Sequence, residues 1–257
     1  MPEDAWTYVW LAAAAFAAGI VNSIAGGGTL LTFPSLLAVV PPVVANGTST
    51  VALVPGSLSA VWGFRRDIAT IRRWVPLLVP PSIVGGLLGS FLVTRLPERY
   101  FDAMVPWLIL TAALLFLFQP ILARHAGASE KAAPGAGKVA AVVVLQFFVA
   151  VYGGYFGAGI GILMLSALGL MGMSDILAMN CLKNLLAASI NGVSVLVFAG
   201  EGVVRWELAA IMAPTAIAGA YAGARMAQRI DRRIVRGLVV AIGLSLAVYY
   251  FYQRWNS

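Results

Sequence analysis

Long runs of apolar residues alternate with short polar segments along this sequence of 257 residues. Ten such runs span about residues 6–24, 29–40, 46–64, 74–94, 101–119, 139–156, 160–173, 175–199, 206–226 and 235–252. Eight are long enough to cross a hydrocarbon core of about 30 Å as a helix, whereas 29–40 and 160–173 are too short. Only 11% of the residues are charged, against about 25% in soluble domains. We therefore predict an all-α polytopic membrane protein that lies in a lipid bilayer.

The charged and reactive residues argue against several classes of function. Lys and Arg outnumber Asp and Glu by 17 to 10, but they fall in short segments between apolar runs. That pattern is typical of topology-setting charges and not of a surface that binds nucleic acid. Cys181 and His125 are the only residues of their types, so the sequence predicts no disulfide, no metal site and no cofactor. No Ser/His or Asp/Asp arrangement lies within the apolar runs, so an enzyme is not expected.

A weak internal repeat relates the two sides of the polar segment 120–138. At a spacing of 133–134 residues, Ala25-Gly26-Gly27-Gly28-Thr29-Leu30 aligns with Ala158-Gly159-Ile160-Gly161-Ile162-Leu163, and Asn46 aligns with Asn180. Gly85-x-x-x-Gly89 aligns with Gly219-x-x-x-Gly223, two pairs of small residues typical of close helix packing. We predict an N-terminal transmembrane repeat over 1–119, a linker over 120–138 and a C-terminal transmembrane repeat over 139–257.

Lys and Arg are distributed unevenly between the two sides that this organisation implies. Twelve lie in 65–73, 120–138 and 225–236, against four in the segments that would face the other side. Because cytoplasmic loops are enriched in Lys and Arg, we expect a cytoplasmic linker 120–138 and an N-terminus outside the plasma membrane. Five apolar runs separate the start of one half from the start of the other, so the two repeats are predicted to have inverted topology.

Glycine clusters at 26–28 and 157–161 each lie between a long apolar run and a short one. In secondary transporters built from inverted repeats, substrates bind near the membrane midplane between the ends of discontinuous or re-entrant helices. Each short helix would present free backbone N–H groups and the positive end of its dipole, both of which favour an anion. The alternative is that these glycines only allow helices to pack closely.

Polar residues open the run that follows each short helix: Asn46-Gly47-Thr48-Ser49-Thr50 and Asn180-Cys181-Leu182-Lys183-Asn184. Their amides and hydroxyls can donate hydrogen bonds to an oxyanion, or else join helices to one another. Lys183 is the only Lys or Arg well inside an apolar run, where a cation costs at least about 2.5–3.5 kcal/mol. We expect it to contact the substrate or gate its path, unless the ammonium reaches the membrane surface.

These motifs resemble the TauE/SafE group of sulfite and organosulfonate exporters. The resemblance covers essentially the whole chain, and it lies in Gly19-Ile20-Val21-Asn22-Ser23-Ile24-Ala25-Gly26-Gly27-Gly28-Thr29 followed by Pro34, in Ala45-Asn46-Gly47-Thr48-Ser49, in Gly153-Gly154-Tyr155-Phe156-Gly157-Ala158-Gly159-Ile160-Gly161, and in Lys183-Asn184. It implies an exporter of sulfur-containing anions such as sulfite, sulfonates or thiosulfate. The predicted substrate-binding residues are Asn22, Gly26, Gly27, Gly28, Thr29, Asn46, Thr48, Ser49, Gly157, Gly159, Gly161, Lys183 and Asn184.

The resulting hypothesis is alternating-access export of a small anion. No Asp or Glu lies deep in an apolar run, so no proton relay is evident. The membrane potential alone would favour the exit of an anion by about 2.3 kcal/mol per charge and 100 mV. Coupling to sodium through backbone carbonyls stays open, as does the oligomeric state. So do another small anion such as a carboxylate and a non-transporting membrane scaffold.

Overall fold

The chain is entirely helical, without strands, in the residues that the computed structural model describes, which are 5–127, 135–227 and 232–255. The first half contains α1 (Ala5–Ile24), α2 (Thr29–Leu37), α3 (Pro42–Gly63), the short η1 (Arg65–Asp67) and α4 (Ile68–Ile71), α5 (Val75–Arg95) and α6 (Glu98–Gly127). The second half contains α7 (Ala136–Tyr155), α8 (Ile160–Leu170), α9 (Ile176–Gly200), α10 (Trp206–Met226) and α11 (Arg232–Trp255). The all-α prediction is therefore confirmed.

Six helices are long and apolar enough to cross a membrane: α1, α5, α6 over 98–121, α7, α9 and α11 over 234–253. With 22 and 21 residues, α3 and α10 have similar lengths, but their polar and small residues make them less apolar. The two runs predicted to be too short form α2, with 9 residues, and α8, with 11. The chain is thus a polytopic membrane protein in which each short helix follows a long one.

Helix α6 is longer than the sequence predicts. It continues to Gly127, into the range 120–138 interpreted as a linker, and α7 begins at Ala136. Alanine and leucine in 121–126 are strong helix formers, so this part of the segment extends the helix. The remainder, 128–134, lies outside the described residues.

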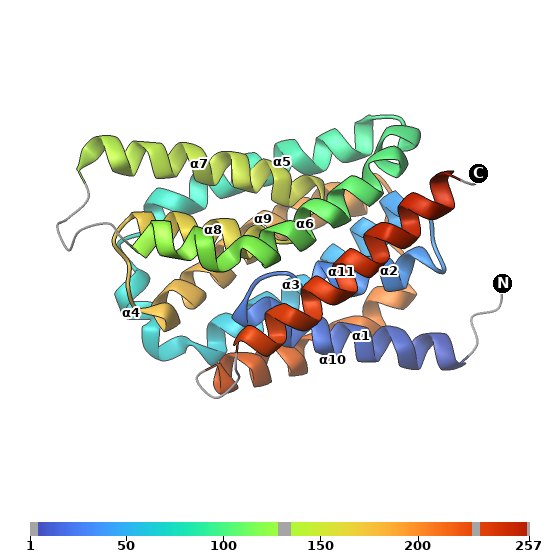
Figure 1. The fold of residues 1–257 in the computed structure, drawn as a ribbon, viewed down its shortest axis with the longest axis horizontal. Coiled ribbons are helices and arrows are strands. Elements are labelled where there is room, and N and C mark those ends of the chain that lie inside the picture. The colour runs from blue at the N-terminus through green and yellow to red at the C-terminus, as the bar shows by residue number, and fades with distance from the viewer. Residues whose placement is uncertain (1–4, 128–134, 228–231, 256–257) are drawn as a thin grey trace.

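The two pairs of long and short helices enter the molecule from opposite ends (Figure 1). α1 begins at the end where both chain termini lie, and α2 leads back to that end, where Leu37 shares a pocket with the start of α6 and the end of α11. α7 begins at the other end, which also holds α4. Each long helix and the short helix after it therefore turn inside the molecule, at the glycine clusters.

Small residues let helices from the two halves approach each other closely. α5 packs against α7, and a Cβ placed on Gly89 would clash with the carbonyl oxygen of Val151. α10 packs against α1, and a Cβ on Gly219 would clash with the carbonyl oxygen of Phe16. Larger residues would force these backbones apart, so both glycine pairs have the close-packing role that the sequence predicts.

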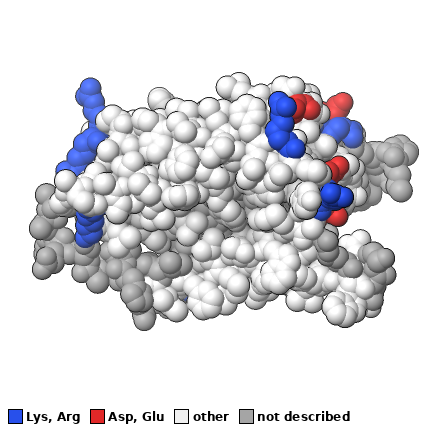
Figure 2. Space-filling view, turned by 90° about the horizontal axis from the view of Figure 1, so that it is seen from above, with Lys and Arg blue, Asp and Glu red and all other residues white. Residues whose placement is uncertain are grey.

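Charged side chains gather at the two ends of the molecule, and the long middle section in Figure 2 shows none. The end with α4, where Arg65, Arg66, Arg72 and Arg73 are exposed, shows only Lys and Arg in this view, whereas the opposite end shows both signs. Large apolar side chains are also exposed to the surroundings, among them Phe148 at 62%. A surface of this kind suits a hydrocarbon layer bounded by two polar faces.

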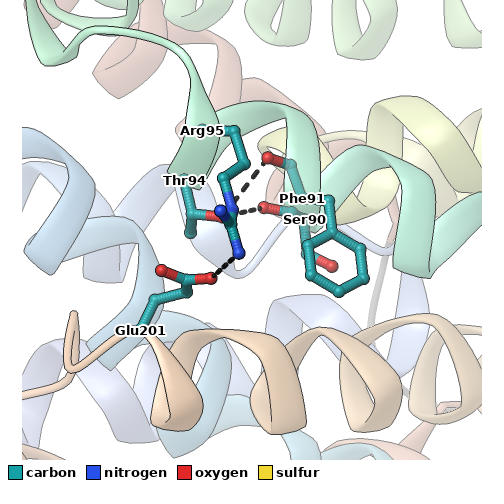
Figure 3. Close-up of polar contacts among 5 residues, drawn as sticks. All are labelled: Ser90, Phe91, Thr94, Arg95 and Glu201. Carbon is teal, nitrogen blue, oxygen red and sulfur yellow. Dashed lines mark hydrogen bonds and ion pairs between the residues drawn. The ribbon is translucent and has the colours of Figure 1, made fainter.

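One ion pair joins the two halves at the end opposite α4 (Figure 3). Arg95, the last residue of α5, contacts Glu201, which follows α9, with 2.9 Å between Nη2 and Oε1. In the same turn of α5, Thr94 Oγ1 donates to the carbonyl oxygen of Ser90 at 3.0 Å. The Arg95 side chain is 70% exposed, so water screens the pair and it contributes little to stability.

Candidate functional site

The two helix breaks touch each other through glycine. Between α1 and α2, Gly26 has a φ of 77°, a conformation that other residues rarely adopt. Gly161 lies in the first turn of α8, and a Cβ on this residue would lie 2.5 Å from the Cα of Gly26. Since side chains do not approach a backbone so closely, only hydrogen fits at this contact. The structure therefore brings these two predicted site residues together from the two halves of the chain.

The other glycines near the breaks are required by packing and by helix geometry. Gly28 and Gly159 are the N-cap residues of α2 and α8. A Cβ on Gly27 would clash with the ring of Phe116, and a Cβ on Gly28 would clash with the carbonyl oxygen of Ala18. The close-packing alternative thus holds for Gly27 and Gly28, as one part of their role.

The starts of α2 and α8 leave backbone donors free. Neither helix has a side chain that caps its first turn. The N–H groups of Thr29 and Ile160, the first residues of the two helices, have no acceptor among the described residues. Unpaired N–H groups and the positive end of a helix dipole together attract an anion. The contact between the breaks places two such helix starts next to each other.

Lys183 holds the end of α1 from inside the protein. Its Nζ donates hydrogen bonds to the carbonyl oxygens of Asn22, at 2.8 Å, and Ser23, at 3.0 Å. Asn184 Nδ2 also donates to the carbonyl of Ser23, at 3.1 Å. These carbonyls belong to the last turn of α1, which lacks intrahelical N–H partners and carries the negative end of the dipole. Lys183 is only 1% exposed, so its ammonium does not reach the membrane surface.

Asn46 holds the end of α7, the other long helix that stops at a break. Its Nδ2 donates to the carbonyl oxygen of Tyr155, the last residue of α7, at 3.0 Å. A carbonyl oxygen can only accept, so the amide must present its nitrogen to Tyr155 and leave Oδ1 available. That Oδ1 is buried and has no hydrogen-bond partner among the described residues, as is also the case for Oδ1 of Asn180 and Asn184.

Three further predicted site residues make hydrogen bonds between segments. Thr48 Oγ1 accepts from the backbone N–H of Arg205, at 3.0 Å, at the start of α10. Ser49 Oγ lies 2.6 Å from the hydroxyl oxygen of Thr32 in α2. Asn22 Nδ2 donates to the hydroxyl of Ser57 in α3, at 3.2 Å. Interhelical bonding, the alternative to substrate binding, is thus what the structure shows at these positions.

Thr29 and Asn191 present polar atoms beside Gly157, a residue that is partly exposed although the residues around it are buried. A Cβ built on Gly157 would lie 3.9 Å from Thr29 Oγ1 and 4.0 Å from Asn191 Oδ1. Both side chains are themselves partly exposed, so a small ligand can reach them. Sequence reasoning did not select Asn191, although it lies seven residues after Asn184 and therefore on the same face of α9.

Two large hollows lie away from the breaks. One, of about 820 Å³, opens at the end that holds both termini, between the α2–α3 turn and the polar residues Asp102 and Gln253. The other, of about 870 Å³, runs between α1, α2 and α11 and is lined almost only by apolar residues. Neither is lined by the glycines that meet at the breaks.

Comparison with protein families decides the class. The family model described as "Sulfite exporter TauE/SafE" matches residues 11–250. The chain belongs to the TauE/SafE family. The part of this TauE/SafE protein that the model matches includes both helix breaks, Lys183 and Asn191.

Curated relatives of this TauE/SafE protein are described as transporters. A "Probable membrane transporter protein" of Haemophilus influenzae is 30% identical over 243 residues, which cover 93% of each chain. "Probable membrane transporter protein ORF9" of Sinorhizobium sp. is also 30% identical, over 93% of this chain and 90% of the relative. "Probable membrane transporter protein YfcA" of Escherichia coli is 27% identical, over 93% and 87%. No solved structure matches significantly. The TauE/SafE protein is therefore a membrane transporter and not an enzyme.

Proposed function

We propose that this TauE/SafE protein is a secondary transporter that exports small sulfur-containing anions, sulfite or a short organosulfonate, by alternating access. The observation that carries the proposal is the contact between Gly26 and Gly161, which joins two uncapped helix starts inside the molecule. Two positive helix ends that converge on one place form an anion site without a fixed side-chain charge. The description of the family supports sulfur-containing anions as the substrates.

Lys183 makes the region around the first break favourable to an anion. The end of α1 would otherwise place unpaired carbonyl oxygens and negative dipole charge close to the start of α2. The ammonium neutralises this end through its bonds to Asn22 and Ser23. In this proposal Lys183 supplies positive charge to the site through the electric field, while Thr29 and Asn191 supply the polar contacts.

We further propose that the halves 1–119 and 139–257 act as inverted repeats that rock against each other. The contact pattern supports this arrangement: α1 of the first half packs against α10 of the second, and α7 of the second packs against α5 of the first. In the membrane we place the N-terminus outside and the segment 120–138 in the cytoplasm, because the exposed arginines of 65–73 lie at the opposite end from the termini.

Flux through proteoliposomes tests the proposed substrate. We expect wild-type protein to release sulfite faster when the potential drives anions outward, with competition from a short sulfonate. Thr29→Val removes a hydroxyl from the proposed site, and a hydrogen bond to a charged group is worth about 1.5–3 kcal/mol. Its apparent affinity for sulfite should therefore fall by about 10- to 100-fold. Thr111→Val, at an exposed position in the apolar helix α6, is the matched control and should leave flux unchanged.

Other outcomes would redirect the proposal. Flux of thiosulfate or a carboxylate without flux of sulfite would keep the transporter and replace its substrate. No flux of any of these anions under any imposed gradient would argue for a non-transporting scaffold. Sulfite flux that ignores a potassium-diffusion potential would rule out the potential as the driving force.

A further inference from the structure

The two helix breaks share a backbone pattern at a spacing of 131 residues. Gly26 and Gly157 both have positive φ angles, of 77° and 83°. The carbonyl oxygen of Val21 accepts from two N–H groups beyond the end of α1, and that of Tyr152 does the same at α7. By this spacing, the carbonyls of Asn22 and Ser23 in α1 correspond to those of Gly153 and Gly154 in α7.

The corresponding carbonyls differ in what binds them. Those of Asn22 and Ser23 accept from the ammonium of Lys183. Those of Gly153 and Gly154 accept no hydrogen bond from the described residues. The helices that supply these contacts, α3 and α9, begin 134 residues apart, at Pro42 and Ile176, so the counterpart of Lys183 is Ser49. One helix end therefore has a covalently attached cation, and the other has none from the corresponding position.

We propose that the end of α7 binds a small monovalent cation, Na⁺, in the place that corresponds to the ammonium of Lys183 at α1. The ligands are the carbonyl oxygens of Gly153 and Gly154 together with Oδ1 of Asn46, whose own Nδ2 is fixed on the carbonyl of Tyr155. This Oδ1 is an acceptor without a partner in a residue that is 1% exposed. A buried, unpaired acceptor is costly to a fold and calls for a ligand that satisfies it.

The chemistry of these ligands favours a monovalent cation. All three are neutral oxygens, and the end of a helix adds only partial negative charge. Divalent cations prefer carboxylates, and no cluster of three acidic, His or Cys residues occurs in the described part of the chain. Backbone carbonyls at the ends of interrupted helices are a recurrent way for transporters to bind Na⁺. Asn184 is not equivalent, because the ammonium of Lys183 already lies beside its amide on the carbonyl of Ser23.

The role of the cation rests on the proposed function, whereas its binding does not. If anion transport occurs as proposed, Na⁺ at α7 and Lys183 at α1 make the two breaks electrically similar, and the rate of transport depends on Na⁺. Binding itself needs no substrate. Thermal stability in the absence of sulfite therefore separates a failure of the cation site from a failure of the sulfite assignment.

The experiment measures the melting temperature of purified wild-type protein in NaCl and in choline chloride at equal ionic strength. A ligand that binds only the folded state stabilises it, so we expect a saturable Na⁺-specific rise of a few degrees, about 2–4 °C for each kcal/mol of binding energy. Asn46→Ala should lose this rise. Asn180→Ala is the matched control, because Asn180 is as buried and also has an unpaired Oδ1, and it should keep the rise.

A second variant keeps the test decisive if Asn46→Ala does not fold. Asn46→Asp replaces the neutral ligand with a carboxylate, and it should reach half-saturation at a Na⁺ concentration at least about tenfold lower. The proposal is overturned if the wild type responds equally to sodium and choline, if Asn46→Ala keeps the Na⁺ response, or if Asn180→Ala loses it. An unchanged half-saturating concentration in Asn46→Asp would contradict it as well.

Discussion

At the scale of single residues, two positions decide how the breaks are built, and each does so through the backbone of the other half. Gly161 lies against the backbone of Gly26, so it needs to be small and not flexible. Lys183 lies on the carbonyls of Asn22 and Ser23, so it needs to be long and cationic. Both requirements come from contacts between segments that are more than a hundred residues apart.

Gly161→Ala should separate the two breaks. Alanine is normally the better residue in a helix by about 0.5–1 kcal/mol, but its Cβ would lie 2.5 Å from the Cα of Gly26. We expect a net loss of about 1–3 kcal/mol, as for an overpacked core, seen as a lower melting temperature and reduced flux. Gly192→Ala in α9 is the control, because a Cβ there meets no atom within 4 Å, and it should be neutral or stabilising. Equal melting temperatures for the two variants would contradict the direct contact.

Lys183→Met should destabilise the protein. Methionine fills a similar volume but cannot donate to the carbonyls of Asn22 and Ser23. The loss of hydrogen bonds from a charged donor costs at least about 1.5 kcal/mol, which lowers the melting temperature of a chain of this size by about 3–6 °C. Differential scanning fluorimetry in detergent would measure the shift. Lys138→Met, at an exposed position, should leave it unchanged, and a similar drop in both variants would refute the specific role of Lys183.

At the scale of elements, the ion pair between the ends of α5 and α9 should matter little for stability. Arg95 is mostly exposed, so the coupling energy between Arg95 and Glu201 is expected to stay below about 1 kcal/mol. A double-mutant cycle of Arg95→Gln and Glu201→Gln, followed by melting temperature, gives this value, and added salt should lower it further. A coupling energy above about 2 kcal/mol would mean that the pair is shielded from water, contrary to its exposure.

The sequence predicts the elements better than it predicts their contacts. The glycine clusters and the lengths of the apolar runs are local properties, so the short helices α2 and α8 could be predicted. The pairing of Ala25 with Ala158 was two residues out of step with the backbone, which pairs Gly26 with Gly157. Sequence identity aligned the glycines, whereas the position of the turn depends on where each helix ends. α8 is two residues longer than α2, which brings the spacing close to that seen downstream.

The candidate site could be predicted only in part. Lys183 was noticeable because a cation in an apolar run needs a reason, but its partners in α1 depend on how α9 packs against α1. Asn191 gave a weak signal, since a single amide in a membrane helix has several ordinary explanations. Its proximity to Thr29 and Gly157 follows from three helices meeting at one place, and no pattern within a single helix encodes that.

At the scale of the whole molecule, the proposed orientation predicts which end is accessible from outside the cell. In a Cys181→Ser background without other cysteines, Glu201→Cys should react with a membrane-impermeant maleimide added to intact cells. Arg66→Cys, in the segment next to α4, should react only after the membrane is permeabilised. Both positions lie at helix ends in the described structure, so labelling tests orientation and not burial. The reverse pattern would place the N-terminus in the cytoplasm.

The contact between Gly26 and Gly161 also has a mechanical meaning. Two V-shaped helix pairs that meet at their tips, with nothing larger than hydrogen between them, form a fulcrum near the centre of the molecule. A tilt of one half about such a point widens the gap at one end and narrows it at the other by the same lever. A leak would require the fulcrum itself to come apart, and the most closely packed glycines of the breaks oppose that.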